Sequence, residues 1–290
     1  MRFGVNTFVW RSPFATERDL DLVPHVAELG AEVFEVAVED PALIDADALG
    51  AALRRAGLAP IVCGAYGPGR DVGDPDPGVR ATTLAYVERL LGLAERVGAT
   101  IVAGPAYGSV GLARALSDTE RRAERDRVVG ALREAAQMAA SHGVRLALEP
   151  LNRFETDRVN TVEQGLRLCD EVGHDAVGLH LDTFHMHIEE RDSGAAVRAA
   201  MAAGRLFHVH ACENDRGVPG RGQVAWESVT NALTDVGYDG DVVIESFTPA
   251  VTSIAAAGCL WRPVAPDQDT IAREGLAFLR RLLAPTPERG

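Results

Sequence analysis

The chain has 290 residues and a formal net charge of −13, and all 29 of its basic residues are arginine. The absence of lysine excludes enzymes that use a lysine amine to form a Schiff base or to hold pyridoxal phosphate. The acidic balance argues against nucleic acid as a partner, because affinity for nucleic acid depends on neutralising phosphates. Apolar residues make up 47% of the chain, as in a globular protein with a core.

Nothing in the chain indicates a membrane, an export signal or a nucleotide cofactor. No apolar run approaches the roughly 20 residues of a membrane span. Polar and turn residues appear too early for a signal peptide, and no GxGxxG motif follows the first strand. The four cysteines, Cys63, Cys169, Cys212 and Cys259, have no paired spacing. We therefore expect a cytoplasmic protein in a reducing compartment, without disulfide bonds or a zinc knuckle.

Short apolar or β-branched segments alternate with longer helical patterns along the whole chain. Eight segments are predicted as strands: 2–9, 33–38, 59–66, 100–107, 145–151, 177–184, 206–213 and 241–247. Eight helical patterns follow them in turn: 16–30, 41–57, 76–98, 117–143, 161–173, 193–204, 225–237 and 267–284. Eight such units without a break in composition predict one domain over residues 1–290, a (β/α)₈ barrel of the α/β class. A doubly wound open sheet is the alternative.

A polar residue stands at the end of each of four consecutive predicted strands. These residues are Glu149, Asp182, His210 and Glu245, spaced 33, 28 and 35 residues apart. In a barrel, the carboxyl ends of the strands form the mouth that carries the active site. Each residue alone could be a polar strand end that meets solvent, but four in succession favour a shared site. Three clustered carboxylates resist ionising together, and an oxygen-rich set with one imidazole suits Mn²⁺, Mg²⁺ or Co²⁺.

Other polar residues lie close to these strand ends. Glu155, His185 and Arg216 follow them by three to six residues. On loops over the mouth they could bind a polyhydroxylated ligand, although isolated loop residues are more often simply solvated. Strand alternation places His180 and His208 one layer below the mouth, as hydrogen-bonded core histidines or as partners of the ligands. A Pro- and Gly-rich loop at 66–78 is predicted to form part of the pocket wall.

Four stretches of the chain carry a resemblance to a known family. They are "LALEPLNRFET", "LDTFHMHIEE", "HVHACENDRGVPGRGQVAW" and "VVIESF". The chain resembles the xylose-isomerase-like TIM-barrel superfamily, and within it the ketose 3-epimerases of the D-tagatose and D-psicose (allulose) type. The resemblance implies one divalent metal ion, with Mn²⁺ the first choice, held by Glu149, Asp182, His210 and Glu245. It also implies a homodimer or homotetramer.

The resemblance further implies roles for five site residues. Glu149 and Glu245 would be the acid/base pair, and Glu155, His185 and Arg216 would contact the substrate near its carbonyl end. Carbon 3 of a 2-ketose bears an acidic proton because it is α to the carbonyl. We therefore hypothesise inversion at C3 by proton transfer through a cis-enediolate, with the ion polarising the carbonyl.

Other functions remain as alternatives. The same ligand set would serve an aldose–ketose isomerase, a hydroxypyruvate isomerase or an inosose-processing enzyme. A metal-dependent endonuclease would need a more basic surface, and a sugar sensor without catalysis would not need two bases. The loops "VNTFVW" and "CGAYGPGR" depart from the better-known family members, so the preferred ketose is open among tagatose, psicose, ribulose and others. Arg70 is the one obvious residue for a phosphate group on its loop.

Overall fold

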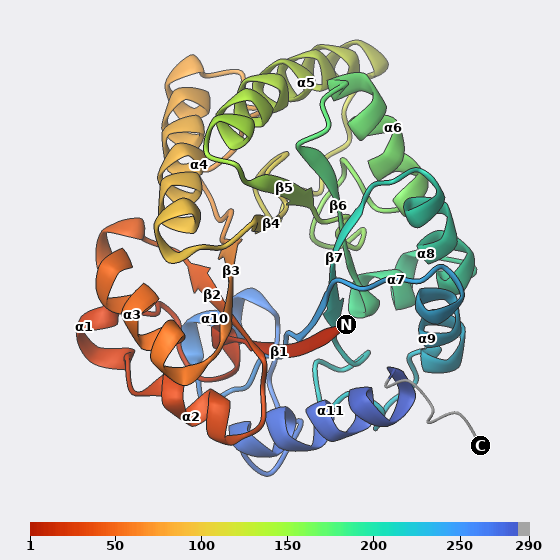
Figure 1. Ribbon diagram of the computed structural model, residues 1–290. Coiled ribbons are helices and arrows are strands. Elements are labelled where there is room, and N and C mark those ends of the chain that lie inside the picture. The colour runs from red at the N-terminus through yellow and green to blue at the C-terminus, as the bar shows by residue number, and fades with distance from the viewer. Residues whose placement is uncertain (284–290) are drawn as a thin grey trace.

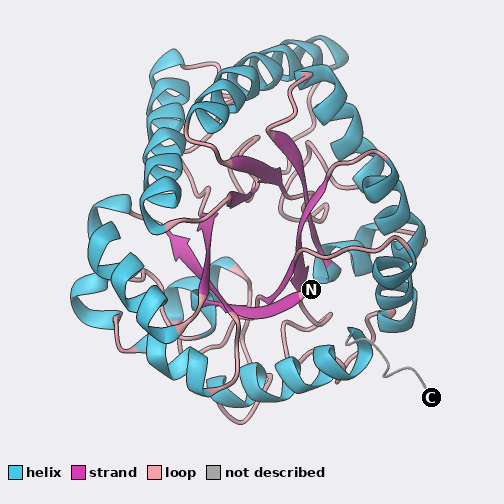
Figure 2. Ribbon diagram, in the orientation of Figure 1, coloured by secondary structure: helices cyan, strands magenta, loops and turns pink. Residues whose placement is uncertain are grey.

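The computed structural model describes residues 1–283 and contains eight strands that form one closed ring (Figure 1). The strands are β1 Arg2–Asn6, β2 Val33–Val38, β3 Ala59–Gly64, β4 Ile101–Gly104, β5 Arg145–Leu148, β6 Val177–Asp182, β7 Leu206–Ala211 and β8 Asp241–Ile244. Every neighbouring pair is parallel, and β1 closes the ring by pairing with β8. Figure 2 shows the strands enclosed by an outer layer of helices. The predicted (β/α)₈ barrel is confirmed.

The helices lie between the strands in chain order. They are η1 Thr7–Val9, α1 Thr16–Asp19, α2 Leu22–Glu28, η2 Pro41–Leu43, α3 Ala46–Ala56, α4 Pro77–Val97, α5 Asp118–Ser141, α6 Val162–Val172, α7 Thr183–Glu189, α8 Ser193–Ala202, α9 Trp226–Asp235, α10 Thr252–Ala257 and α11 Gln268–Leu283. The predicted helix at 16–30 is interrupted after Asp19, because Pro24 lacks an N–H and in a continuous helix its ring would collide with the carbonyl of Leu20. The last residue of the predicted final helix, Ala284, lies outside the described residues.

The helix after β6 begins earlier than the sequence suggested. The strand predicted over 177–184 was too long, because β6 ends at Asp182 and α7 starts at Thr183. The side chain of Asp182 accepts a hydrogen bond from the N–H of Phe184 at 2.8 Å, so it caps the helix as soon as the strand ends. His185 and His187 therefore both lie on α7.

Elsewhere capping residues mark the helix ends. Asp76 caps α4, and Ser117 and Thr161 form capping boxes at the starts of α5 and α6. Gly57 and Gly98 follow α3 and α4 with φ of 71° and 83°, in the left-handed region that glycine adopts without strain. These local signals hold each helix at the length that returns the chain to the next strand.

One apolar cluster consists of strand residues alone and fills the inside of the barrel. Its buried members are Val33, Ile61, Ile101, Ala103, Ala147, Phe207 and Val243. The pairing of β6 with β7 shifts between Leu179 and His180, so that His180 lies opposite His208 and Phe207 is an extra residue. A Cβ atom on Gly178 would come within 2.6 Å of the Phe207 ring, so only glycine fits there.

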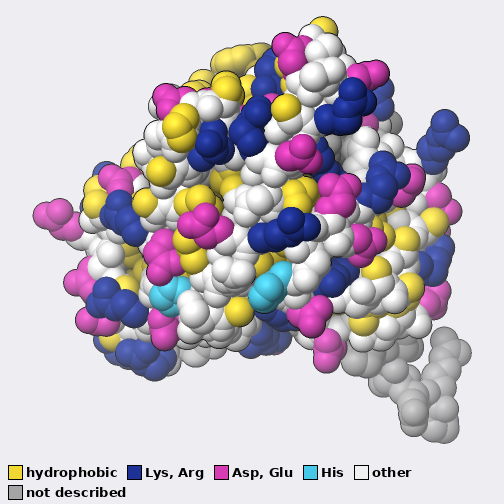
Figure 3. All heavy atoms as spheres, turned by 90° about the horizontal axis from the view of Figure 1, so that it is seen from above, with side chains coloured by type: hydrophobic (Ala, Val, Ile, Leu, Met, Phe, Trp, Pro, Cys, Tyr) yellow, Lys and Arg dark blue, Asp and Glu magenta, His cyan; other side chains and the backbone are white. Residues whose placement is uncertain are grey.

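The outer surface carries mixed charge. Arginine and acidic side chains are interspersed on the face shown in Figure 3. Many charged side chains of the described residues form exposed ion pairs, such as Arg125 with Glu171 at 2.8 Å. None of the helices within residues 1–283 is long and apolar enough to cross a membrane.

A buried ion-pair network fastens the loops after β3 and β5 to α5. The side chain of Arg158 is only 6% exposed. Its Nη2 donates to Glu124 Oε1 at 2.7 Å and to Asp71 Oδ2 at 2.9 Å, and its Nη1 donates to the backbone oxygen of Tyr107 at 2.9 Å. The hydroxyl of Tyr107 donates in turn to the backbone oxygen of Glu149 at 2.8 Å. The network thus supports the backbone at one of the predicted site residues.

Replacing Arg158 by methionine is expected to lower the free energy of unfolding by about 3–5 kcal/mol, because Asp71 stays buried without its cation and Glu124 keeps only Arg114. Urea denaturation followed by circular dichroism measures this. Arg125→Met is the control, since it removes one exposed ion pair, and it should cost no more than about 1 kcal/mol. Equal losses for the two variants would show that the buried network stabilises the fold no more than an exposed ion pair does.

The same network predicts how stability depends on pH. Burial opposes ionisation of Glu124, but its bonds to Arg158 and Arg114 outweigh burial and hold its pKa below the ordinary value of 4.5. A carboxyl with a lowered pKa in the folded state stabilises the fold above its unfolded pKa, and this contribution is lost as the pH falls through the folded pKa. We expect the stability gap between the wild type and Glu124→Gln to be full at neutral pH and to shrink in acid below pH 4.5. A gap that does not change with pH would contradict this.

Candidate active site

The four strand-end residues lie together at the mouth of the barrel. One ligand atom from each of Glu149, Asp182, His210 and Glu245 lies within 4.8 Å of the others, and all four residues are buried. Glu149 and Glu245 directly follow the last residues of β5 and β8, while Asp182 and His210 lie in β6 and β7. Asp182 pairs with His210 in the register of the two strands.

The cluster has the features of a cation site. Glu149 Oε1 and His210 Nδ1 are buried and have no hydrogen-bond partner within the described part of the chain. Burial, together with repulsion from Glu245 and Asp182, raises the pKa of Glu149 well above its ordinary range. Burial also raises the pKa of Asp182 to about 6, against the attraction of Arg216. A divalent cation would relieve this repulsion and engage both free atoms, so the residues fit a metal ion.

Glu245 differs from Glu149 in its surroundings. Burial opposes its ionisation, but His210 and Arg216 outweigh burial and hold its pKa below the ordinary value. His210 Nδ1 lies 3.7 Å from Glu245 Oε1. The two glutamates thus have pKa values shifted in opposite directions, a pattern common in acid/base pairs.

His185 presents a proton to the cluster. Its Nδ1 accepts a hydrogen bond from the backbone N–H of Asn152 at 3.0 Å, so the neutral ring carries its proton on Nε2. Nε2 lies 3.7 Å from Glu149 Oε1 and 3.9 Å from Asp182 Oδ2. Burial and the nearby Arg216 keep the pKa of His185 well below its ordinary value. The ring is therefore a neutral hydrogen-bond donor.

Arg216 supplies the positive charge of the site. Its Nη1 donates to Asp182 Oδ2 and to Glu245 Oε2, each at 3.1 Å. The guanidinium lies between two aromatic rings, 3.8 Å from the centre of Phe184 and 4.4 Å from that of Phe247. Its φ of 61° is rare for a residue other than glycine, and such strain persists only where the surroundings determine it. The packing and the ion pairs together fix this side chain.

A cavity of about 300 Å³ opens beside the cluster. Its polar lining includes Glu149, Glu155, His185, Arg216 and Glu245. Its apolar lining includes Phe8, Tyr66, Val110, Leu151 and Phe247. Residues of both divergent loops, and the start of the 66–78 loop, thus contribute to the wall. A hollow of about 380 Å³ against α5 and α6 contains none of the predicted site residues.

Two residues that support the site, Asn152 and Glu35, were not predicted from the sequence. Asn152 holds His185 and also donates through Nδ2 to Glu155 Oε1 at 2.7 Å. Glu35 lies fully buried in the barrel, bonded to His208 and His210. The available signal for Glu35 was a single acid in the apolar strand "VFEVAV".

The structure also shows the surroundings of the two deeper histidines, His180 and His208, and of Arg70. His180 and His208 are both core residues, but only His208 is hydrogen-bonded, since neither ring nitrogen of His180 has a partner in the described structure. Arg70 donates to the backbone oxygens of Ala65 and Glu39, and its guanidinium lies 4.0 Å from the centre of the Tyr86 ring. It thus serves to hold its loop.

The fold and this cluster define a TIM-barrel enzyme with a candidate metal centre at the carboxyl ends of its strands. Residues 23–282 match the family model described as xylose isomerase-like TIM barrel. The chain is 33% identical to a probable ketose 3-epimerase of Synechocystis sp., over 97% of this chain and 96% of that one. It is 34% identical to an L-ribulose 3-epimerase of Mesorhizobium japonicum, over 96% and 93% of the two chains.

The comparison with solved structures agrees. A D-allulose 3-epimerase from Methylomonas sp., solved in complex with D-allulose, matches with a TM-score of 0.91 and 29% identity, covering 97% of each chain. The chain therefore belongs to the xylose isomerase-like TIM-barrel superfamily and, within it, to the ketose 3-epimerases, which are isomerases.

Proposed function

We propose that this protein inverts C3 of a free 2-ketose by proton transfer through a cis-enediolate. The observation that carries the proposal is the placement of two glutamates, Glu149 and Glu245, on one cavity beside a four-residue cation site. The relatives described as an L-ribulose 3-epimerase and a D-allulose 3-epimerase support a ketose of the ribulose or psicose type.

The metal would be held by Glu149, Asp182, His210 and Glu245, with Mn²⁺ as the first choice and Co²⁺ or Mg²⁺ as substitutes. When bound, it would polarise the substrate carbonyl and so acidify the proton on C3. The oxygen-rich ligand set with a single imidazole and without a thiolate is what supports this choice of metal.

The two glutamates would act from opposite sides of the substrate. They follow β5 and β8, which are three strands apart in the closed ring. One carboxylate removes the proton from C3, and the carboxyl of the other protonates the opposite face of the planar enediolate. Reversal of the roles serves the other epimer, which makes the reaction reversible without a redox cofactor.

The remaining polar residues would orient the substrate. The Nε2–H of His185 donates to an oxygen near the carbonyl end, and Arg216 balances the negative charge that develops there. Glu155 accepts a hydrogen bond from a substrate hydroxyl. The apolar wall of the cavity offers few hydrogen-bond partners to the rest of the sugar.

The test is a panel of free and phosphorylated 2-ketoses incubated with the Mn²⁺-loaded protein, with the products separated by chromatography. We expect each free substrate to be converted to its C3 epimer, and the 6-phosphates to react poorly. Conversion only between a ketose and an aldose would instead support an isomerase of the same superfamily.

We also propose that the protein is cytoplasmic, with residues 1–290 as one domain, and forms a homodimer or homotetramer. Two large aromatic side chains, Phe154 and Trp261, are 74% and 76% exposed, and exposed apolar surface of this kind favours association. Sedimentation velocity tests the assembly, and a monomer at micromolar concentration would contradict it.

A further inference from the structure

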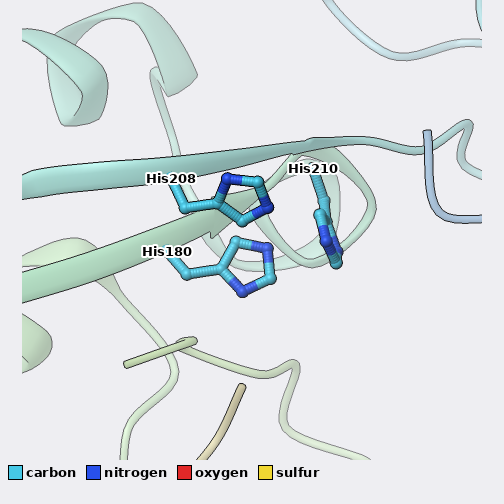
Figure 4. Close-up of side chains that lie close together, drawn as sticks. All are labelled: His180, His208 and His210. Carbon is cyan, nitrogen blue, oxygen red and sulfur yellow. The ribbon is translucent and has the colours of Figure 1, made fainter. Parts of the chain in front are cut away.

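Three histidine rings are packed together inside the barrel (Figure 4). His180 comes from β6, and His208 and His210 come from β7. The ring centres are 4.9 Å apart for His180 and His208, 3.9 Å for His180 and His210, and 5.0 Å for His208 and His210. All three side chains are 0% exposed. Their nitrogens lie close enough together to suggest a second metal site.

The hydrogen bonds of the cluster point to a different role. His208 Nε2 lies 2.7 Å from Glu35 Oε2, and His210 Nε2 lies 2.6 Å from Glu35 Oε1. A carboxylate only accepts hydrogen bonds, so each of these nitrogens carries a proton. A protonated nitrogen has no lone pair for a metal, and two of the three histidines are therefore engaged with Glu35.

Glu35 is itself held in one orientation. Asn6 Nδ2 donates to Glu35 Oε1 at 2.6 Å. The amide of Asn6 cannot be reversed, because its Oδ1 accepts the N–H of Phe8 at 2.9 Å. Asn6 and Glu35 are paired in the register of β1 and β2, which lie far from β7 along the sequence. Contacts from two other strands, β1 and β7, thus converge on one carboxylate that is 0% exposed.

We propose that Glu35 is a positioning residue for the metal centre, which fixes the proton of His210 on Nε2 and so leaves Nδ1 free for the cation. This inference rests on the proposed metal site, although not on the identity of the sugar. Nδ1 has no hydrogen-bond partner within residues 1–283 and lies 3.7 Å from Glu245 Oε1, on the side of the other ligands. Carboxylates that bond the second nitrogen of a ligating histidine fix its tautomer and raise its basicity.

The side-chain network also predicts which replacement of Glu35 is tolerated. Glutamine can keep its carbonyl oxygen toward Asn6 and His210, because both donate there, and can turn its amide toward His208 Nε2 once that nitrogen has given up its proton. Methionine has a similar volume but accepts from neither histidine. Glu35→Met should therefore free His210 to take either tautomer, whereas Glu35→Gln should retain the productive one.

Calorimetric titration of the metal-free protein with Mn²⁺ tests the proposal without measuring activity. We expect Glu35→Met to weaken Mn²⁺ binding by about 10–100-fold, and Glu35→Gln to recover most of that loss. Asp241→Asn is the matched control, since it neutralises another buried carboxylate, which pairs with Arg2 at the start of β8 and away from the cavity, and it should bind Mn²⁺ like the wild type. Wild-type affinity in Glu35→Met would overturn the proposal.

A second measurement uses only the wild-type protein, so it does not depend on whether a variant folds. In the wild type labelled with ¹⁵N-histidine and loaded with diamagnetic Zn²⁺, long-range ¹⁵N–¹H correlations report which nitrogen of each ring is protonated. We expect the proton of His210 on Nε2, and a proton on Nδ1 would overturn the proposal. If no ketose is epimerised but these results hold, the proposed function fails and the role of Glu35 stands.

Discussion

Replacement of Glu245 by glutamine is expected to lower kcat for epimerisation by about 10²–10⁴-fold, the usual contribution of a positioned general base. Glutamine has the same shape and can still accept from Arg216, whose Nη1 lies 3.1 Å from Glu245 Oε2. It cannot take up the C3 proton. Loss of deuterium from a C3-labelled ketose to water, followed by NMR, measures this step directly.

Glu149→Gln is the companion variant, because the two bases serve opposite faces. Both variants should epimerise far more slowly than the wild type, but each should still exchange the C3 proton of the one epimer that faces its remaining glutamate. Mn²⁺ binding must be measured in both, since each residue is also a candidate ligand. Exchange of both epimers at the wild-type rate in Glu245→Gln would remove this residue from the mechanism.

Removal of the metal is the second large effect that we expect. Polarisation of a carbonyl by a bound cation is worth several kcal/mol in the transition state, which corresponds to a rate loss of about a thousandfold. Treatment with a chelator followed by gel filtration should inactivate the protein, and added Mn²⁺ should restore its activity. The physical reason is the cluster of three buried carboxylates that otherwise repel one another.

Two aspartates provide a matched pair for this test. Asp182 caps α7 by accepting from Phe184 N at 2.8 Å, and Asp192 caps α8 by accepting from Ala195 N at 2.9 Å. Asparagine is an equally good N-cap, so both Asp→Asn variants should fold. Asp182→Asn should lose its response to Mn²⁺, and Asp192→Asn should keep it. Full activity in the chelated wild type would contradict a metal-dependent reaction.

The ring of strand-end residues could be predicted because the fold determines it. Parallel strands in a closed barrel bring their carboxyl ends to one mouth, so residues that follow the fifth to eighth strands must become neighbours. The separation of Glu149 from Glu245 along the chain is therefore irrelevant to their distance in space. The two substrate-side residues His185 and Arg216 could be placed near the mouth for the same reason.

The residues that support this ring could not be predicted in the same way. Glu35 meets His210 across the inside of the barrel, and that contact depends on strand tilt and on the extra residue in β7. Whether Asn152 bonds His185 depends on the path of a loop without regular structure. The start of α7 was missed because Asp182 has two roles, as a strand end and as a helix cap, and only the first was considered.

Incorporation of deuterium from D₂O into a free ketose by the Mn²⁺-loaded wild type tests the central claim most directly. We expect deuterium at C3 of both the remaining substrate and its C3 epimer, because the proton leaves to a carboxylate that exchanges with water. Deuterium at C1 together with an aldose product, or conversion without any label, would contradict the account.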